Sequence, residues 1–202
     1  MTEDPLATPP GADHLPDQSL PPRARRGLTR GQALALILVA VVAKLAFFAW
    51  LDRPWGCDCG RIWALPGDPQ LNSRVMLDPY TLMHLVSGAA LVQLLMRLRP
   101  SWTTWTLLAA VFASGALWEI AENLPVSIRL FNYDAGDPLA YQGDSRLNSL
   151  ADTAAAAIGA LLALRLPFVA VALATLAVEV LLWVWIDDSF ILATVRALAG
   201  FA

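Results

Sequence analysis

Charged residues are scarce in this sequence, and the apolar residues are not spread evenly. Only 15% of the 202 residues are charged, 57% are hydrophobic, and the mean hydropathy is +0.54. A soluble domain is close to half apolar and a quarter charged, so this composition argues against an ordinary soluble fold. The apolar residues gather in blocks of roughly twenty, the length with which a helix crosses about 30 Å of hydrocarbon. The sequence therefore predicts an all-α, integral membrane helical bundle that crosses a bilayer about five times.

Further absences narrow the function. The net charge is only −3, which argues against a nucleic-acid partner. The chain has neither a G-x-S-x-G nucleophile motif nor an H-E-x-x-H zinc motif. It also has no detectable internal repeat, although small ion-coupled transporters normally have inverted repeats with polar groups at the midplane. An enzyme of this sequence would have to act through metal-bound water or a carboxylate base.

Cysteine is limited to two residues, Cys57 and Cys59, in the segment CDCG. A disulfide between positions i and i+2 is sterically awkward, and two cysteines do not make a disulfide scaffold. A lone C-x-C could hold a soft metal, but the signal is not specific. We expect instead a turn held by Gly60 and packed with Trp55 and Trp63.

The apolar blocks define the domain organisation. Residues 1–30 are rich in proline and polar residues and are predicted to form a disordered cytoplasmic tail. The transmembrane domain covers 31–186, and 187–202 is predicted to be a short periplasmic tail or interfacial helix. Asp78 and Pro79 are a good N-cap and first helical residue for the second span. The predicted spans are 32–51, 80–98, 103–124, 147–164 and 168–186.

Arginines in short flanking segments predict the orientation, because such segments stay in the cytoplasm. With five spans, one side of the membrane receives Arg23, Arg25, Arg26 and Arg30, then Arg97, Arg99 and Arg165. We therefore expect a bacterial inner-membrane protein with a cytoplasmic N-terminus. Both long connections, 52–77 and 125–146, would then lie on the periplasmic side.

Ionisable residues inside the spans are the most informative feature. Each costs about 2.5–3.5 kcal/mol in hydrocarbon, so each is a candidate functional residue. These residues are Lys44, His84, Glu119, Glu122, Asp152 and Glu179. With a rise of about 1.5 Å per residue, helices running in alternating directions bring all of them to one outer-leaflet layer. Helical spacing also groups polar residues on shared faces, in the sets Glu119, Glu122 and Asn123; Asp144, Asn148 and Asp152; Ser145 and Ser149; and His84 and Ser87.

One interpretation of this layer is a catalytic metal site. The predicted metal ligands are His84, Glu119, Glu122, Asp144 and Asp152. The predicted catalytic residues are Glu119, Glu122 and Asp152. The supporting residues are Asn123, Asn148, Ser87, Ser145 and Arg146. Carboxylates with a single histidine suit a divalent Mg, Mn, Ca or carboxylate-bound Zn ion.

The alternative is that these side chains only hydrogen-bond the helices together. Lys44 and Glu179 are expected to form a structural pair across the first and fifth spans.

Four motifs carry a resemblance to a known family. They are RPWGCDCG with the following Trp63, DPYTLMHLVSG, WEIAENLP and GDSRLNSLADT. In this order and spacing the chain resembles the bacterial membrane proteins grouped as domain of unknown function 2585. The resemblance implies a multi-pass plasma-membrane protein and brings no established activity. The family pattern has a second histidine three residues after the first, where this chain has Ser87, so a site built on two imidazoles would lack one ligand. A fainter likeness to VanZ-like membrane proteins rests on His84, Glu119 with Glu122, and Arg146 with Asp152.

Three functional classes follow from these observations. The first is metal-dependent chemistry on a lipid or lipid-linked substrate at the periplasmic leaflet. The second is a non-enzymatic envelope protein that binds a lipid headgroup or a protein partner. A small ion-coupled transporter ranks last, because the polar layer is off-centre. The sequence does not decide between the enzyme and the binder; membrane lipids are the expected partners of both.

Overall fold

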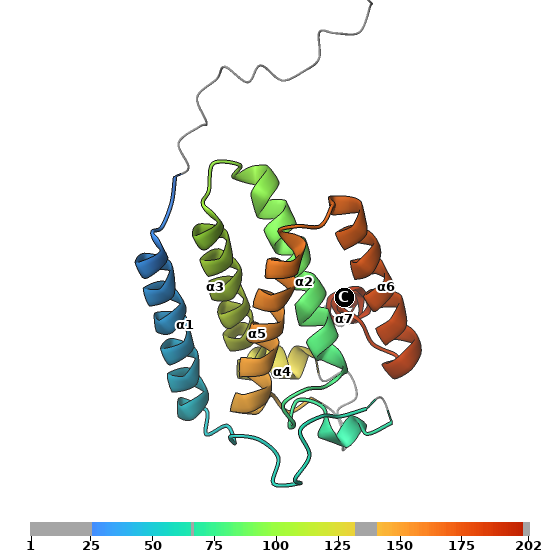
Figure 1. The fold of residues 1–202 in the computed structure, drawn as a ribbon. Coiled ribbons are helices and arrows are strands. Elements are labelled where there is room, and N and C mark those ends of the chain that lie inside the picture. Colours follow the sequence, from blue (N-terminus) through green and yellow to red (C-terminus); the bar gives the residue numbers. More distant parts are fainter. Residues whose placement is uncertain (1–25, 66, 132–140, 200–202) are drawn as a thin grey trace, which may run out of the picture.

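The protein is a bundle of helices. The computed structural model describes residues 26–65, 67–131 and 141–199. Within these ranges it contains no named strand, so the predicted all-α fold is confirmed (Figure 1). The predicted tail, 1–30, lies outside the described residues as far as position 25. The helices are α1 (Arg30–Trp50), α2 (Pro79–Leu98), α3 (Thr104–Glu122), α4 (Pro125–Phe131), α5 (Arg146–Ala163), α6 (Phe168–Ile186) and α7 (Phe190–Ala199), with a 3-10 turn at Pro69–Leu71.

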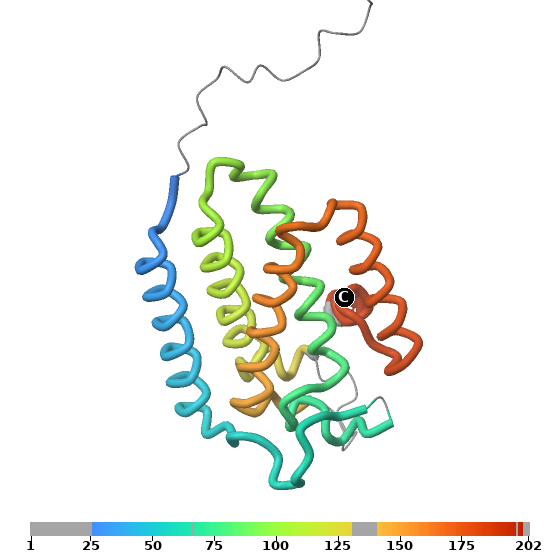
Figure 2. The backbone as a smooth tube through the Cα atoms, in the orientation of Figure 1, coloured from blue at the N-terminus to red at the C-terminus, as the bar shows by residue number. Residues whose placement is uncertain are grey.

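The long helices of the described chain, α1, α2, α3, α5 and α6, run side by side in alternating directions (Figures 1 and 2). The start of α1, the α2–α3 turn and the α5–α6 turn lie at one end, and the 52–65 segment and α4 lie at the other. α5 packs against both α2 and α3, α1 against α3, and α6 against α2. The remaining helices, α4 and α7, do not run along the bundle. α4 is short and follows α3, and α7 is seen end-on in Figure 1, crossing the direction of α6.

The helix starts are encoded locally. Asp78 caps α2 by accepting hydrogen bonds from the backbone N–H groups of Tyr80 and Thr81, which confirms the predicted N-cap. Thr103 caps α3 and Ser145 caps α5 in the same manner. These oxygens satisfy N–H groups that have no partner in the first turn of a helix.

The connection 52–77 folds against the start of α5. The backbone N–H of Ser145 donates to the Ser73 carbonyl at 2.7 Å, and that of Arg146 to the Pro54 carbonyl at 2.9 Å. Cys57 and Cys59 form a disulfide in this connection. The expectation of an unbridged turn was therefore wrong. The steric argument did not allow for the local backbone, which brings the two Cα atoms to 5.1 Å, within the usual range for a disulfide.

Apolar side chains cover the outside of the bundle, and many polar ones lie inside it. Leu38 and Val39 on α1 are each 63% exposed, whereas Glu119 and Lys44 are 0% and 1% exposed. This is the reverse of a soluble protein and suits a hydrocarbon solvent. The chain is a helical membrane protein.

Four of the described helices, α1, α2, α3 and α6, have the length and apolar composition needed to cross a membrane. α5 occupies the fourth predicted span and is not among these four. It packs through small buried residues, including Ala155, Ala156 and Ala160. Its role as a fifth crossing stays a prediction.

Candidate metal centre

The tightest helix crossing in the bundle positions the candidate site. α2 and α5 approach so closely that a Cβ on Gly88 would lie 1.9 Å from the Ala156 carbonyl oxygen. A Cβ on Gly159 would lie 1.8 Å from the Leu85 carbonyl oxygen. Only glycine fits at such a contact between backbones. The crossing brings His84 of α2, one turn from Gly88, beside Asp152 of α5, two turns from Gly159.

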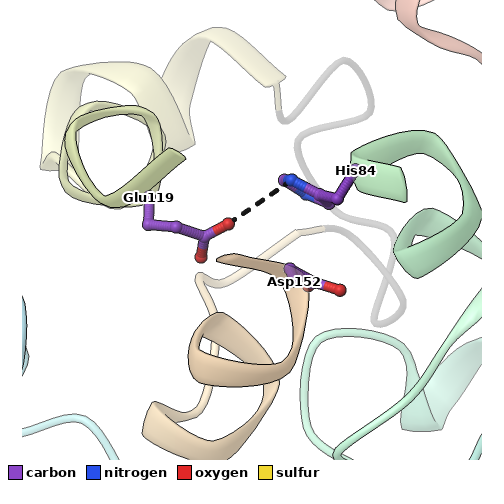
Figure 3. Close-up of side chains that lie close together, drawn as sticks. All are labelled: His84, Glu119 and Asp152. Carbon is purple, nitrogen blue, oxygen red and sulfur yellow. Dashed lines mark ion pairs between the residues drawn. The ribbon is translucent and has the colours of Figure 1, made fainter. Parts of the chain in front are cut away.

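α3 adds a carboxylate to this pair. Glu119 Oε1 lies 3.6 Å from His84 Nδ1. Figure 3 shows these two side chains pointing toward one another from α3 and α2, with Asp152 of α5 beside them. One ligand atom from each of the three residues lies within 4.8 Å of the others. Three helices that are far apart in the sequence therefore place one imidazole and two carboxylates close together.

A second acidic group adjoins the first and shares Glu119 with it. Ligand atoms of Glu119, Glu122 and Asp144 also lie within 4.8 Å of one another. Glu119 and Glu122 are one turn apart on α3, and Asp144 comes just before the N-cap of α5. All five predicted metal ligands are thus brought together in two overlapping groups.

Hydrogen bonds hold Asp144 in place. Its Oδ2 accepts from the Tyr141 hydroxyl at 2.7 Å and from the Asn123 carboxamide. Its backbone N–H donates to Asn123 Oδ1 at 2.8 Å, and Asn123 also donates to the Glu119 carbonyl at 3.0 Å. Asn123 therefore ties the end of α3 to the start of α5. Tyr141 was not predicted as part of the site, because nothing in the sequence marks a loop tyrosine as a neighbour of Asp144.

The central carboxylate has unused acceptor atoms. Among the described residues, neither carboxylate oxygen of Glu119 has a hydrogen bond of normal geometry, and the same is true of Oδ1 of Asp152, although all three atoms are buried. The Ser149 hydroxyl is a donor that acts on Glu119. Leaving a buried polar group without a partner costs about 1–3 kcal/mol, and more if the group is charged. Buried charges in proteins are normally paired or bound to a metal. A cation at this point would satisfy these atoms.

Lys44 is the buried cation nearest to these acids. Its Nζ donates to the Ser149 carbonyl at 2.8 Å and to Thr153 Oγ1 at 2.6 Å, both on α5. It interacts electrostatically with Glu119, Glu122, Asp144 and Asp152. The predicted pairing of Lys44 with Glu179 was therefore wrong.

Glu179 lies on α6 and belongs to neither of the two ligand groups, which together we call the cluster. Its Oε2 accepts from the backbone N–H of Ile191 at 3.2 Å. Similar depth in two spans did not imply contact, because α1 packs on α3 and α6 packs on α2.

The supporting residues fall into two groups. Asn123, Ser145 and Asn148 are buried near the cluster, and Asn148 donates to Asp78 Oδ2 at 3.3 Å. Ser87 is exposed and belongs to neither acidic group. Arg146 stacks its guanidinium 5.1 Å from the centre of the Trp55 ring, and no ion pair joins it to Asp152 within the described part of the chain. Ser87 follows His84 by three residues, a step that turns a helix by about 300°, so the two residues share a face only approximately.

Asp78 adds a further buried acid beside the cluster. Besides capping α2, it accepts from the Ser73 backbone N–H at 2.7 Å. Burial raises the pKa of Asp78, and the hydrogen bond from Ser73 opposes that shift. The sequence marked Asp78 only as an N-cap. Its position beside the cluster depends on the packing of α5 against the 52–77 connection, which no local pattern reveals.

Comparison with known proteins decides the family. A family model described as a protein of unknown function, DUF2585, matches residues 48–201. The chain belongs to this family. The predicted resemblance is confirmed, whereas the fainter likeness to VanZ-like proteins is not shown by these comparisons. No solved structure matches the chain.

Bacterial relatives cover most of the chain. A UPF0314 protein of Rhizobium meliloti is 37% identical over 167 residues, which is 78% of this chain and 83% of the relative. A UPF0314 protein of Brucella anthropi is 34% identical over 169 residues, or 83% and 86% of the two chains. One from Sphingopyxis alaskensis is 32% identical over 166 residues, or 80% and 87%.

Proposed function

We propose that this protein is a membrane-embedded metalloprotein of the bacterial inner membrane. In this proposal His84, Glu119 and Asp152 bind a divalent cation near the periplasmic leaflet. The N-terminus lies in the cytoplasm, as the arginine distribution favours. One observation carries the proposal: the Glu119 carboxylate is fully buried, has no hydrogen bond of normal geometry within the described ranges and faces His84 from the adjacent helix.

The donor set favours a particular class of ion. Two or more carboxylates with one imidazole suit Mg²⁺, Mn²⁺ or Zn²⁺ better than a soft ion such as Cu⁺. Such an ion can lower the pKa of a bound water or polarise a phosphoryl or carbonyl oxygen. These properties support hydrolysis or group transfer, with a remaining carboxylate as the proton acceptor.

The surroundings favour a lipid or lipid-linked substrate. The outer surface is apolar, and the cluster lies near the start of α2, the end of α3 and the start of α5, at one end of the bundle. His84 and Glu122 are only partly buried, so the cluster reaches the protein surface. A molecule anchored in the bilayer with a polar headgroup fits both features.

Metal analysis of the full chain, purified in detergent and treated with chelator before reloading, tests the proposal. We expect wild-type protein to retain a divalent cation through gel filtration, and Glu119→Gln to lose it. Glu179→Gln is the matched control, since Glu179 is also a buried glutamate in an apolar helix but lies outside the cluster. It should retain the ion.

Asp152→Asn supplies a second variant in case Glu119→Gln does not fold, and circular dichroism and gel filtration check folding of each. Wild-type protein that binds no cation would overturn the proposal. So would a loss of the ion in Glu179→Gln equal to that in Glu119→Gln.

A further inference from the structure

Glu119 belongs to both acidic groups. It completes one with His84 and Asp152 and the other with Glu122 and Asp144. Each of its two carboxylate oxygens is buried and lacks a hydrogen bond of normal geometry among the described residues. A carboxylate bound to a single cation through one oxygen would leave the other oxygen unsatisfied. Two free oxygens between two sets of ligands match a bridging carboxylate.

We infer that the site holds two divalent cations bridged by Glu119, which extends the single-ion site proposed above. His84 and Asp152 complete the first position, which we call the histidine position. Glu122 and Asp144 complete the second, the acidic position. Cations in two-metal centres lie about 3.5–4 Å apart. The two ligand groups share the Glu119 carboxylate, which is compatible with that spacing.

The electrostatic balance favours bound cations. Asp78 acts electrostatically on both Glu119 and Asp152, so five carboxylates share this region with the single ammonium of Lys44. When all are ionised, they exceed Lys44 by four negative charges, of which the Arg53 guanidinium against Gly143, next to Asp144, offsets one. Divalent cations neutralise the remainder, as protonation of the acids would also do. An uncompensated charge buried in a helical bundle is strongly unfavourable.

The surroundings of the acidic position resemble those of known ligands in metal sites. Ligating carboxylates are usually oriented by hydrogen bonds from neighbouring groups. Asp144 has two such donors at Oδ2, the Tyr141 hydroxyl and the Asn123 carboxamide. The position is formed at the end of α3 and the start of α5, both of which are fixed by the Asn123 contacts. It is therefore built from ordered elements.

The two positions predict different effects of substitution. Asp144→Asn removes a ligand of the acidic position while keeping the side-chain shape, so one cation should remain. His84→Gln should empty the histidine position and leave one cation. Glu119→Gln removes the shared ligand and should lose both. Glu179→Gln, outside both groups, should keep two.

Manganese is the probe, because Mn²⁺ suits carboxylate-rich sites and is paramagnetic. Chelator-treated full-length protein in detergent is titrated with Mn²⁺, and bound ion is counted by elemental analysis after gel filtration. Electron paramagnetic resonance then reports whether the bound ions are close. We expect two Mn²⁺ per wild-type chain with a spin-coupled spectrum, and one Mn²⁺ per Asp144→Asn chain with an uncoupled spectrum.

The outcomes separate this inference from the proposed function. One Mn²⁺ per wild-type chain, uncoupled, would overturn the bridged pair and leave the single-ion proposal standing. Two ions without coupling would also overturn it, because the ions would then lie apart. No bound Mn²⁺, Mg²⁺ or Zn²⁺ would overturn both. Wild-type stoichiometry decides the matter even if a variant fails to fold.

Discussion

Two regions of this bundle bury glutamate in different ways. Between α2, α3 and α5, Glu119 lies among other acids, and neither of its carboxylate oxygens has a hydrogen bond of normal geometry from the residues that the structure describes. Between α6 and α7, Glu179 is also buried, but its Oε2 accepts the backbone N–H of Ile191 near the start of α7. The second arrangement is a helix-capping contact of the kind that stabilises a helix N-terminus.

The difference shows that burial of an acid is not by itself a sign of a site. Both residues share the same chemistry and occur in apolar helices, so hydropathy marks them equally. Only their surroundings separate them, because one carboxylate meets a backbone donor and the other meets an imidazole and further carboxylates. Buried acids whose acceptors are already used are structural, and those with free acceptors are candidates for binding.

The largest expected effect concerns the crossing that builds the first region. In Gly159→Ala the new Cβ would lie 1.8 Å from the Leu85 carbonyl oxygen, so α2 and α5 must separate. Overpacking of this kind costs about 1–3 kcal/mol or more, which exceeds the helix-propensity gain of about 1 kcal/mol. We expect a clear loss of thermal stability in detergent, together with loss of bound metal as His84 and Asp152 move apart.

Gly115→Ala in α3 is the matched control, because its added Cβ would meet Thr153 Cγ2 at an ordinary 3.6 Å. It should be neutral or slightly stabilising. Equal thermal stability of the two alanine variants would show that the α2–α5 crossing is looser than described, and the contrast between the regions would lose its structural basis.

A smaller effect concerns the cation in the first region. Lys44→Met removes an ammonium that competes with a metal ion for the same carboxylates. Metal affinity should therefore rise by at least about tenfold, or roughly 1.4 kcal/mol. Metal-free protein should become less stable by about 1–3 kcal/mol, because the Ser149 carbonyl and Thr153 hydroxyl lose their partner. Calorimetric titration with Mn²⁺ and thermal melting measure the two changes, and weaker metal binding by the variant would contradict the electrostatic argument.

The smallest effect tests the link between the two regions. The Tyr80 hydroxyl at the start of α2 donates to Asp188 Oδ2 at 2.9 Å, just beyond the end of α6. Burial raises the pKa of Asp188, and the hydrogen bond from Tyr80 opposes that rise. Tyr80→Phe should therefore raise this pKa further and cost about 1 kcal/mol when Asp188 is ionised.

The pH dependence has a definite sign. A carboxyl group with a raised folded-state pKa favours the folded state most below its unfolded pKa, and that contribution is lost as the pH rises through the folded value. The cost of Tyr80→Phe should thus be larger at pH 8 than at pH 4. Melting curves of both proteins at the two pH values measure it, and a cost that grows toward acid pH would exclude this role for Asp188.

Much of the fold was predictable because local signals determine it. The capping residue Asp78 and Pro79 marked the start of α2, and blocks of apolar residues marked the other long helices. α4 was missed, since a helix of 7 residues is too short to show a helical period or to form an apolar block of spanning length. The disulfide was also missed, because its formation depends on local backbone geometry that composition does not encode.

For the candidate site, the sequence alone determined depth. Helical rise is nearly constant, so residue number along an apolar span places His84, Glu119 and Asp152 in one layer whatever the arrangement of the helices. The choice of neighbours was decided only by the tertiary structure. α5 packs between α2 and α3, which admits Lys44 to the acidic cluster and leaves Glu179 to cap α7. Which helices become neighbours depends on close backbone contacts such as those at Gly88 and Gly159, and these act between segments far apart in the chain.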